Sequence, residues 1–111
     1  MNIEIKAEEG TLIVEISGEL DMVVADEFKQ KVERLLSQKK YDKLILDFKN
    51  VSFIDSSGLG VILGRYKTIS QYNGRMAIVS VQNPVQKILE LSGILRILNI
   101  YPDVSSAIAA M

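Results

Sequence analysis

The sequence predicts an α/β fold built on a single mixed, mainly parallel sheet. Short runs of apolar, often β-branched residues alternate along the chain with segments of helical periodicity, a pattern typical of parallel strands joined by right-handed crossovers. The first two runs are separated only by Glu9-Gly10, which indicates an antiparallel hairpin. The composition, 48% hydrophobic and 24% charged over 111 residues, is that of a globular protein. We therefore expect one domain spanning residues 1–111, with four or five strands and about four helices.

The first third of the chain predicts the hairpin and then a helix. Apolar residues alternate with polar ones over residues 3–7, and residues 12–16 form the second strand. Residues 18–21, Gly-Glu-Leu-Asp, are expected to leave this strand, with Asp21 as the N-cap of the helix. The apolar residues of that helix keep the spacing of one helical face, and they are Ala25, Phe28, Val32, Leu35 and Leu36.

The middle of the chain predicts a central strand followed by a second helix. Residues 43–48 form a nearly continuous apolar run, which is typical of a strand that is covered on both faces. Residues 50–54 lead from it into Asp55-Ser56-Ser57-Gly58-Leu59-Gly60. The helical stripe that follows ends near Asn73-Gly74 and consists of Leu59, Ile62, Leu63, Tyr66 and Ile69.

The last third predicts two further strand and helix pairs. Residues 76–81 indicate a strand, after which Asn83, followed by proline, is expected to be the N-cap of a helix that stops at Gly93. Residues 97–100 indicate a last strand, and Asp103 is expected to cap a short final helix. The complete order is strand, strand and helix, followed by three strand and helix pairs.

The composition excludes several classes of function. The chain has no His and no Cys, so it cannot assemble a Ser-His-Asp or Cys-His site, and we expect neither a catalytic residue nor a metal ligand set. Its 13 basic and 14 acidic residues give a net charge of −1, which offers no electrostatic footprint for nucleic acid or an anionic membrane. The sequence shows neither a membrane-spanning run nor a signal peptide, and we expect a cytoplasmic protein.

Three glycines stand out because each costs up to about 1 kcal/mol relative to alanine in a helix. They are Gly58, Gly60 and Gly64, at the start and on one side of the second predicted helix. Gly60 and Gly64 share a face, which is consistent with close packing of the helix against the sheet. Alternatively, the uncovered helix start lets a phosphate or the backbone of another protein approach Ser56 and Ser57. The two interpretations are compatible.

A nucleotide-binding loop is an alternative interpretation of Gly58-Leu59-Gly60, which follows a strand and opens a helix. The dinucleotide fingerprint requires a third glycine where this chain has Leu63. It also requires an acid about 20 residues further on, where residues 78–80 are Ile, Val and Ser. The sequence therefore disfavours nucleotide binding.

The two serines beside Asp55 have a structural and a functional interpretation. One serine is expected to be the N-cap of the helix, which is the usual role of serine there. An exposed hydroxyl at a helix N-terminus is also a good phosphoacceptor, since phosphate adds about −1.5 to −2 charges next to backbone N–H groups. Asp55, and Asp21 across the adjacent loop, would add negative charge nearby.

The stretch 52–67, Ser-Phe-Ile-Asp-Ser-Ser-Gly-Leu-Gly-Val-Ile-Leu-Gly-Arg-Tyr-Lys, closely resembles the signature of the STAS domain family. Residues 18–21 look like the second motif of that family, and Ser92-Gly93 follows its third-helix pattern, so that the resemblance extends over the whole chain. Within the family, the sequence looks most like the anti-sigma-F factor antagonists of sporulating bacilli. The resemblance implies the STAS fold.

The resemblance also implies a partner switch controlled by phosphorylation. The unphosphorylated antagonist binds an anti-sigma factor that is also an ATP-dependent serine kinase, and this binding frees the sigma factor. The kinase phosphorylates the serine after the motif aspartate, here Ser56, and a PP2C-type serine phosphatase reverses the step. The antagonist needs no cofactor and catalyses nothing. A general-stress sigma pathway, a non-catalytic scaffold and a nucleotide-binding domain stay as alternatives.

The site that the resemblance implies lies on two loops. Ser56 is the phosphorylated residue, and the start of the following helix docks on the kinase, with residues 18–21 on the same edge. The antagonists of bacilli have polar residues after the aspartate that corresponds to Asp21. This chain instead has Met22, Val23 and Val24, which form either a partner contact or ordinary helix packing. The expected partner-binding residues are Asp21, Asp55, Ser56, Ser57, Gly58, Leu59 and Gly60.

Overall fold

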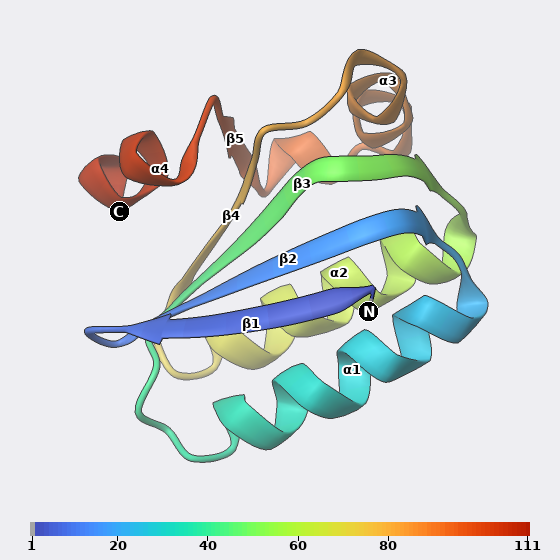
Figure 1. Cartoon of the computed structure of the whole chain (residues 1–111). Helices are drawn as coiled ribbons and strands as arrows, with labels where there is room; N and C mark the ends of the chain where they lie inside the picture. The colour runs from blue at the N-terminus through green and yellow to red at the C-terminus, as the bar shows by residue number, and fades with distance from the viewer. Residues whose placement is uncertain (1) are drawn as a thin grey trace.

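The computed structural model describes residues 2–111 and contains the predicted alternation of strands and helices (Figure 1). A short 3₁₀ turn, Ile94–Arg96, precedes the last strand. The other elements, in chain order, are β1 (Ile3–Glu8), β2 (Thr11–Leu20), α1 (Met22–Leu36), β3 (Lys43–Ile54), α2 (Ser56–Ser70), β4 (Arg75–Val79), α3 (Asn83–Ser92), β5 (Asn99–Tyr101) and α4 (Val104–Ala110).

The five strands form one sheet in the order β1-β2-β3-β4-β5. Strand β1 is antiparallel to β2, whereas β2, β3, β4 and β5 pair in parallel, which confirms the predicted mixed, mainly parallel sheet. Helices α1 and α2 lie side by side along one face, and α4 lies over the other face (Figure 1). Strand β3 is the central strand, as predicted.

Strands β2 and β3 run further than the sequence predicted. Residues 18–20 do not leave β2, since they continue to pair with β3 as far as Leu20 opposite Ile54. The register shifts between Glu15 and Ser17 and again between Gly18 and Glu19, and Gly18 adopts a left-handed backbone with φ of 89°. Of the motif 18–21, only Asp21 lies outside the strand. Pairing with a long parallel neighbour extends the strand beyond its apolar pattern.

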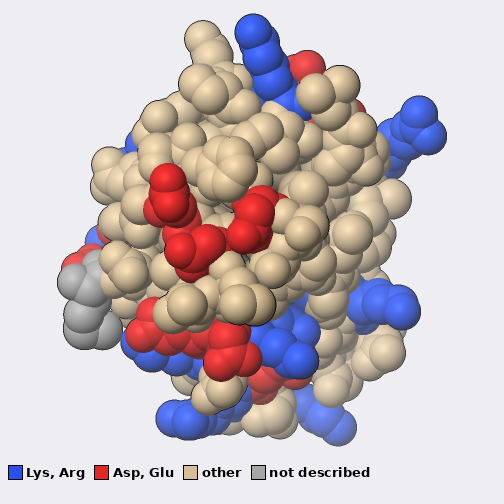
Figure 2. All heavy atoms as spheres, turned by 90° about the vertical axis from the view of Figure 1, so that its right-hand side faces the viewer, with Lys and Arg blue, Asp and Glu red and all other residues tan. Residues whose placement is uncertain are grey.

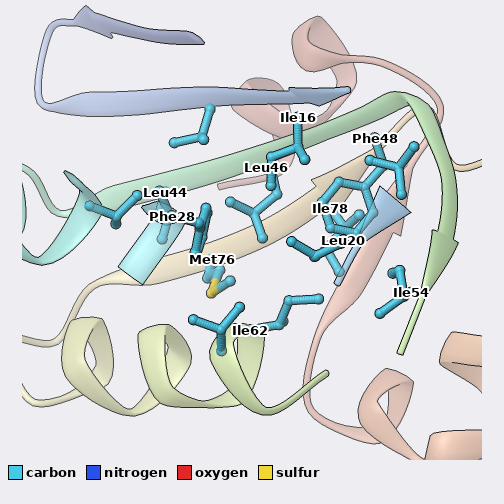
Figure 3. Packing of buried hydrophobic residues seen from close by; sticks show 14 of the residues in the cluster. Ile16, Leu20, Phe28, Leu44, Leu46, Phe48, Ile54, Ile62, Met76 and Ile78 are labelled. Carbon is cyan, nitrogen blue, oxygen red and sulfur yellow. The ribbon is translucent and has the colours of Figure 1, made fainter. Parts of the chain in front are cut away.

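Most of the core lies between the sheet and α1, α2 and α3 (Figure 3). Phe28 of α1 and Ile62 of α2 point from the helices into the same cluster as Leu46 and Phe48 of β3. A smaller cluster lies beneath α4 on the other face, and its buried residues are Ile13, Ile45, Ala77, Val79 and Ala107. Residues 44–48 of β3 are therefore buried on both faces, as the apolar run predicted.

The predicted start of α3 was wrong by one residue. Asn83 is the first helical residue, and Gln82 is the N-cap. No side-chain hydrogen bond caps this helix, because the Gln82 amide instead donates to the carbonyl oxygen of Lys49 at 2.8 Å. The amide thereby ties the loop before α3 to the end of the apolar run of β3.

The end of α3 and the start of α4 confirm the sequence prediction. Gly93 ends α3 with φ of 83°, a left-handed conformation that glycine adopts without strain. Asp103 is the N-cap of α4 and accepts a hydrogen bond from the backbone N–H of Ser106 at 2.8 Å. The last strand is shorter than predicted and starts at Asn99, because Ile97 ends the preceding 3₁₀ turn.

Candidate partner-binding surface

The two sequence motifs meet at the carboxyl edge of β2 and β3. Helix α1 follows β2 and α2 follows β3, and the two strands are parallel neighbours, so both helices begin at the same end of the sheet. The backbone N–H of Asp55 donates to the carbonyl oxygen of Leu20 at 3.4 Å, which joins the two loops directly. The structure thus brings residues 18–21 and 55–60 together, as expected from the sequence.

Both helices begin with an aspartate in nearly the same conformation. Asp21 has φ and ψ of −95° and −172°, and Asp55 has −99° and −173°. The Asp21 carboxylate accepts from the N–H of Val24 at 3.1 Å, and the Asp55 carboxylate accepts from the N–H of Gly58 at 3.0 Å. Asp55, not either serine, is therefore the N-cap of α2, and it fills the role that we considered for a serine.

Ser56 and Ser57 are the first two residues of α2. Ser56 is exposed, whereas Ser57 is half-buried. The first N–H groups of a helix have no partner within the helix and carry its positive dipole end, which favours a negative group placed beside them. The Ser56 hydroxyl is accordingly the more accessible of the two, at a position that tolerates added negative charge.

The glycines at this helix start have different surroundings. A β-carbon on Gly58 would lie 2.6 Å from the carbonyl oxygen of Leu20 and 2.8 Å from the side chain of Ile54, so this position requires glycine. A β-carbon on Gly60 or Gly64 would meet nothing within 4 Å. The interpretation that Gly60 and Gly64 pack closely against the sheet was therefore wrong, because a β-carbon at either position would enter open space.

The apolar residues near the site divide into buried and exposed ones. Val24 packs in the core, whereas Met22 is 69% and Val23 is 74% exposed, so that only Val24 has an ordinary packing role. Leu59 is half-buried against the core. Leu63 is 41% exposed and does not belong to the buried stripe to which we assigned it. Both Met22 and Val23 lie in the first turn of α1, beside the Asp21 cap.

The face that contains the two helix starts is acidic at its centre. Figure 2 shows acidic side chains gathered in the middle of this face, with most Lys and Arg side chains toward its margins. Both N-caps are acidic, and exposed Glu19 adds a third carboxylate at the end of β2. A phosphate here would join negative charge that is already present.

Arg65 is a buried charged residue, behind the candidate surface, whose role the sequence did not predict. Its side chain lies between α1 and α2 and is only 7% exposed, and its Nε atom lies 2.7 Å from Oε1 of Glu33. The Thr68 hydroxyl donates to the same oxygen at 3.0 Å. Burial lowers the pKa of Arg65, while the Glu33 carboxylate opposes that shift. The pair links the two helices whose starts form the site, and no local sequence signal connects residues that are 32 positions apart.

A metal centre and a membrane-spanning helix are both missing from the described part of the chain. Within residues 2–111, no group of three or more His, Cys, Asp or Glu side chains is arranged to hold a metal ion. Over the same range, none of the helices combines the length and the apolar character that crossing a membrane requires.

The comparison with known families identifies this fold and its motifs. A family model described as STAS domain matches residues 2–107. The chain belongs to the STAS domain family. This STAS domain is 41% identical over 113 residues to an anti-sigma F factor antagonist of Paenibacillus polymyxa, covering 100% of this chain and 97% of that protein. It is 28% identical over 100 residues to an anti-sigma-B factor antagonist of Bacillus subtilis, covering 90% of each.

A solved structure shows the same fold as this STAS domain. The crystal structure of TM1081 from Thermotoga maritima superimposes with a TM-score of 0.90 at 33% identity, covering 97% of this chain and 92% of that chain. The likeness extends over almost the whole length of both proteins, which confirms the STAS fold implied by the sequence motifs.

Proposed function

We propose that residues 1–111 act as one STAS domain that is an anti-sigma factor antagonist and switches partners on phosphorylation. In its unphosphorylated form it binds an anti-sigma factor that is also a serine kinase, and this binding releases the sigma factor, here the sporulation factor sigma-F. The 41% identity to an anti-sigma F factor antagonist over the whole chain supports this class of partner.

The observation that carries the proposal is the position of Ser56. It is exposed at the first position of α2, and Asp55 already provides the helix cap, so the Ser56 hydroxyl is not needed to hold the helix together. Asp21, Asp55, Ser57, Gly58, Leu59 and Gly60 surround it or lie on the facing loop, and together they form the proposed docking surface.

The chemical step is a phosphoryl transfer from ATP. The kinase transfers the γ-phosphoryl group to the Ser56 oxygen, the hydroxyl proton is lost, and ADP leaves. The domain then carries about two additional negative charges beside the Asp21 and Asp55 carboxylates. The α2 dipole tolerates this charge within the domain, whereas the partner surface, which had accommodated an uncharged hydroxyl, no longer binds productively. A PP2C-type phosphatase restores the hydroxyl by hydrolysis.

In this scheme the domain supplies a substrate hydroxyl and a docking surface, and its partners supply the catalysis. The domain uses no cofactor, contacts neither nucleic acid nor membrane, and acts in the cytoplasm with the transcription machinery that it regulates. The formal charge of −1 and the absence of His and Cys are consistent with a domain whose partners carry out the catalysis.

The similarity to an anti-sigma-B factor antagonist supports a second candidate, a general-stress pathway with the same mechanism. Calorimetric titration of this protein against purified anti-sigma F factor of Paenibacillus polymyxa and anti-sigma-B factor of Bacillus subtilis distinguishes the two. We expect binding to the first, and loss of that binding after incubation with ATP. Preference for the second factor would assign the stress pathway, and binding to neither would refute the proposed function.

A further inference from the structure

The first turn of α1 repeats the geometry of the first turn of α2 with different side chains. Both turns follow an aspartate cap of nearly the same backbone conformation and the same hydrogen bond to the third helical residue. Met22 therefore occupies on α1 the position that Ser56 occupies on α2, and Val23 corresponds to Ser57. The carboxyl edge of the sheet thus has two equivalent helix starts, of which one bears hydroxyls and the other is apolar.

The apolar helix start leaves its side chains in water. Met22 and Val23 are 69% and 74% exposed, although Val24, which follows them, is buried in the core. Both side chains present apolar surface whose burial is favourable by about 25 cal/mol per Å². Two adjacent exposed apolar residues beside the proposed docking surface offer apolar area that a bound partner protein would cover.

The typical size of a protein interface indicates whether a partner bound at Ser56 also reaches Met22 and Val23. A specific interface buries about 800 Å² on each protein, which corresponds to a patch with a radius of about 16 Å. Axes of packed helices lie about 8–10 Å apart. Helices α1 and α2 are neighbours and begin at the same end of the sheet (Figure 1). A partner interface of this size that is centred on Ser56 therefore extends to Met22 and Val23.

We propose that Met22 and Val23 form an apolar anchor for the anti-sigma factor, an inference that rests on the proposed function. The partner has an apolar pocket beside the site that receives Ser56. Phosphorylation changes the charge at α2 but leaves the anchor unchanged, so the two helix starts have separate roles. The hydroxyl start of α2 switches the affinity, and the apolar start of α1 contributes binding affinity through apolar contact.

The test is a double variant, Met22→Gln with Val23→Thr, which removes apolar character while keeping the length and branching of the side chains. The matched control is Ile108→Gln, since Ile108 is 41% exposed on α4, over the other face of the sheet. Titrated against the Paenibacillus polymyxa anti-sigma F factor, the double variant should bind roughly 10- to 100-fold more weakly than the unchanged protein. The control should bind like the unchanged protein.

The outcomes test the apolar anchor and the proposed function separately. If the unchanged protein binds and the double variant binds equally tightly, the anchor is refuted while the proposed function stands. If the unchanged protein binds neither the anti-sigma F factor nor the Bacillus subtilis anti-sigma-B factor, the apolar anchor and the proposed function are both refuted. A thermal melt of each variant checks that it is folded, and the single variant Val23→Thr, which preserves side-chain shape, repeats the test should the double variant unfold.

Discussion

Gly58 lies directly against the carbonyl group of Leu20, so that a β-carbon at position 58 would lie 2.6 Å from the Leu20 oxygen. This contact places the first turn of α2 on the end of β2 and sets how closely the two motif loops approach. Gly60 lies two residues further on in the same helix, and a β-carbon there would meet nothing within 4 Å. The same substitution therefore has opposite consequences at the two positions.

We expect Gly58→Ala to destabilise the protein by about 1–3 kcal/mol, because the added methyl group meets backbone that cannot move aside. Gly60→Ala should stabilise it by about 0.5–1 kcal/mol, because alanine is the better helix former in open space. Urea unfolding of both variants measures the difference. Equal effects of the two substitutions would show that Gly58 is not the close contact.

Ser56→Ala should abolish phosphate incorporation by the anti-sigma factor kinase with ATP, whereas Ser57→Ala should retain it. The reason is accessibility, since Ser56 is exposed and Ser57 is half-buried behind it. Incorporation is measured with the purified kinase, and peptide mass mapping locates the phosphate. A phosphate found on Ser57 would contradict the assignment.

Ser56→Asp should weaken binding to the anti-sigma factor without lowering the stability of the domain. A carboxylate at the first position of α2 is favourable for the helix dipole, by roughly 0.3–1 kcal/mol, but it adds charge beside Asp21 and Asp55 at the interface. Calorimetric titration gives the affinity and urea unfolding gives the stability. Ser56→Asn serves as the uncharged control of similar size, and equal affinities of the two variants would rule out charge as the cause.

Glu33→Gln should destabilise the protein by about 1–3 kcal/mol, because it leaves the buried Arg65 guanidinium without its opposite charge. Arg65→Met should cost less, since it removes the buried charge and keeps most of the packing. The matched control is Glu27→Gln, which breaks the Lys31–Glu27 pair at the surface of α1 and should cost less than about 0.5 kcal/mol. Urea unfolding at low salt ranks the three variants, and a cost for Arg65→Met above that of Glu33→Gln would refute this account.

Stability should depend on the charge of Asp103 in acid. The Ser106 backbone N–H lowers the pKa of Asp103 below its ordinary value of 3.8 in the folded protein. The stabilisation is therefore complete above pH 3.8 and is lost as the pH falls through the lowered pKa. The stability difference between the unchanged protein and Asp103→Asn should shrink as the pH falls from about 5 to about 2. A difference that stays constant across this range would show that the carboxylate charge does not contribute.

The sequence predicted the order and type of the elements because each has a strong local signal. The helix that starts after Asp21 and the apolar run at 43–48 are examples, since cap chemistry and hydrophobic periodicity act over a few residues. Strand ends were predicted less well. The continuation of β2 through Gly18 to Leu20 depends on a partner strand more than 30 residues away, and no local pattern encodes it.

The candidate site was predicted in its position but not in its internal roles. The motifs placed Asp21 and Ser56 on one edge, which the parallel strands then brought together. Which glycine is confined, Gly58 rather than Gly60, depends on how α2 sits on the sheet, and periodicity does not supply that orientation. The burial of Arg65 against Glu33 depends in the same way on how the two helices pack.

The strand order β1-β2-β3-β4-β5 also determines the shape of the surface that a partner meets. Open α/β sheets form a ligand crevice where the strand order reverses and successive crossovers diverge to opposite sides. In the described sheet every strand lies beside its neighbour in sequence, so the strand order never reverses. Helices α1 and α2, which follow β2 and β3, therefore begin side by side. The carboxyl edge of the described sheet consequently lacks the crevice that forms at a reversal of strand order, and the two helix starts lie next to each other there.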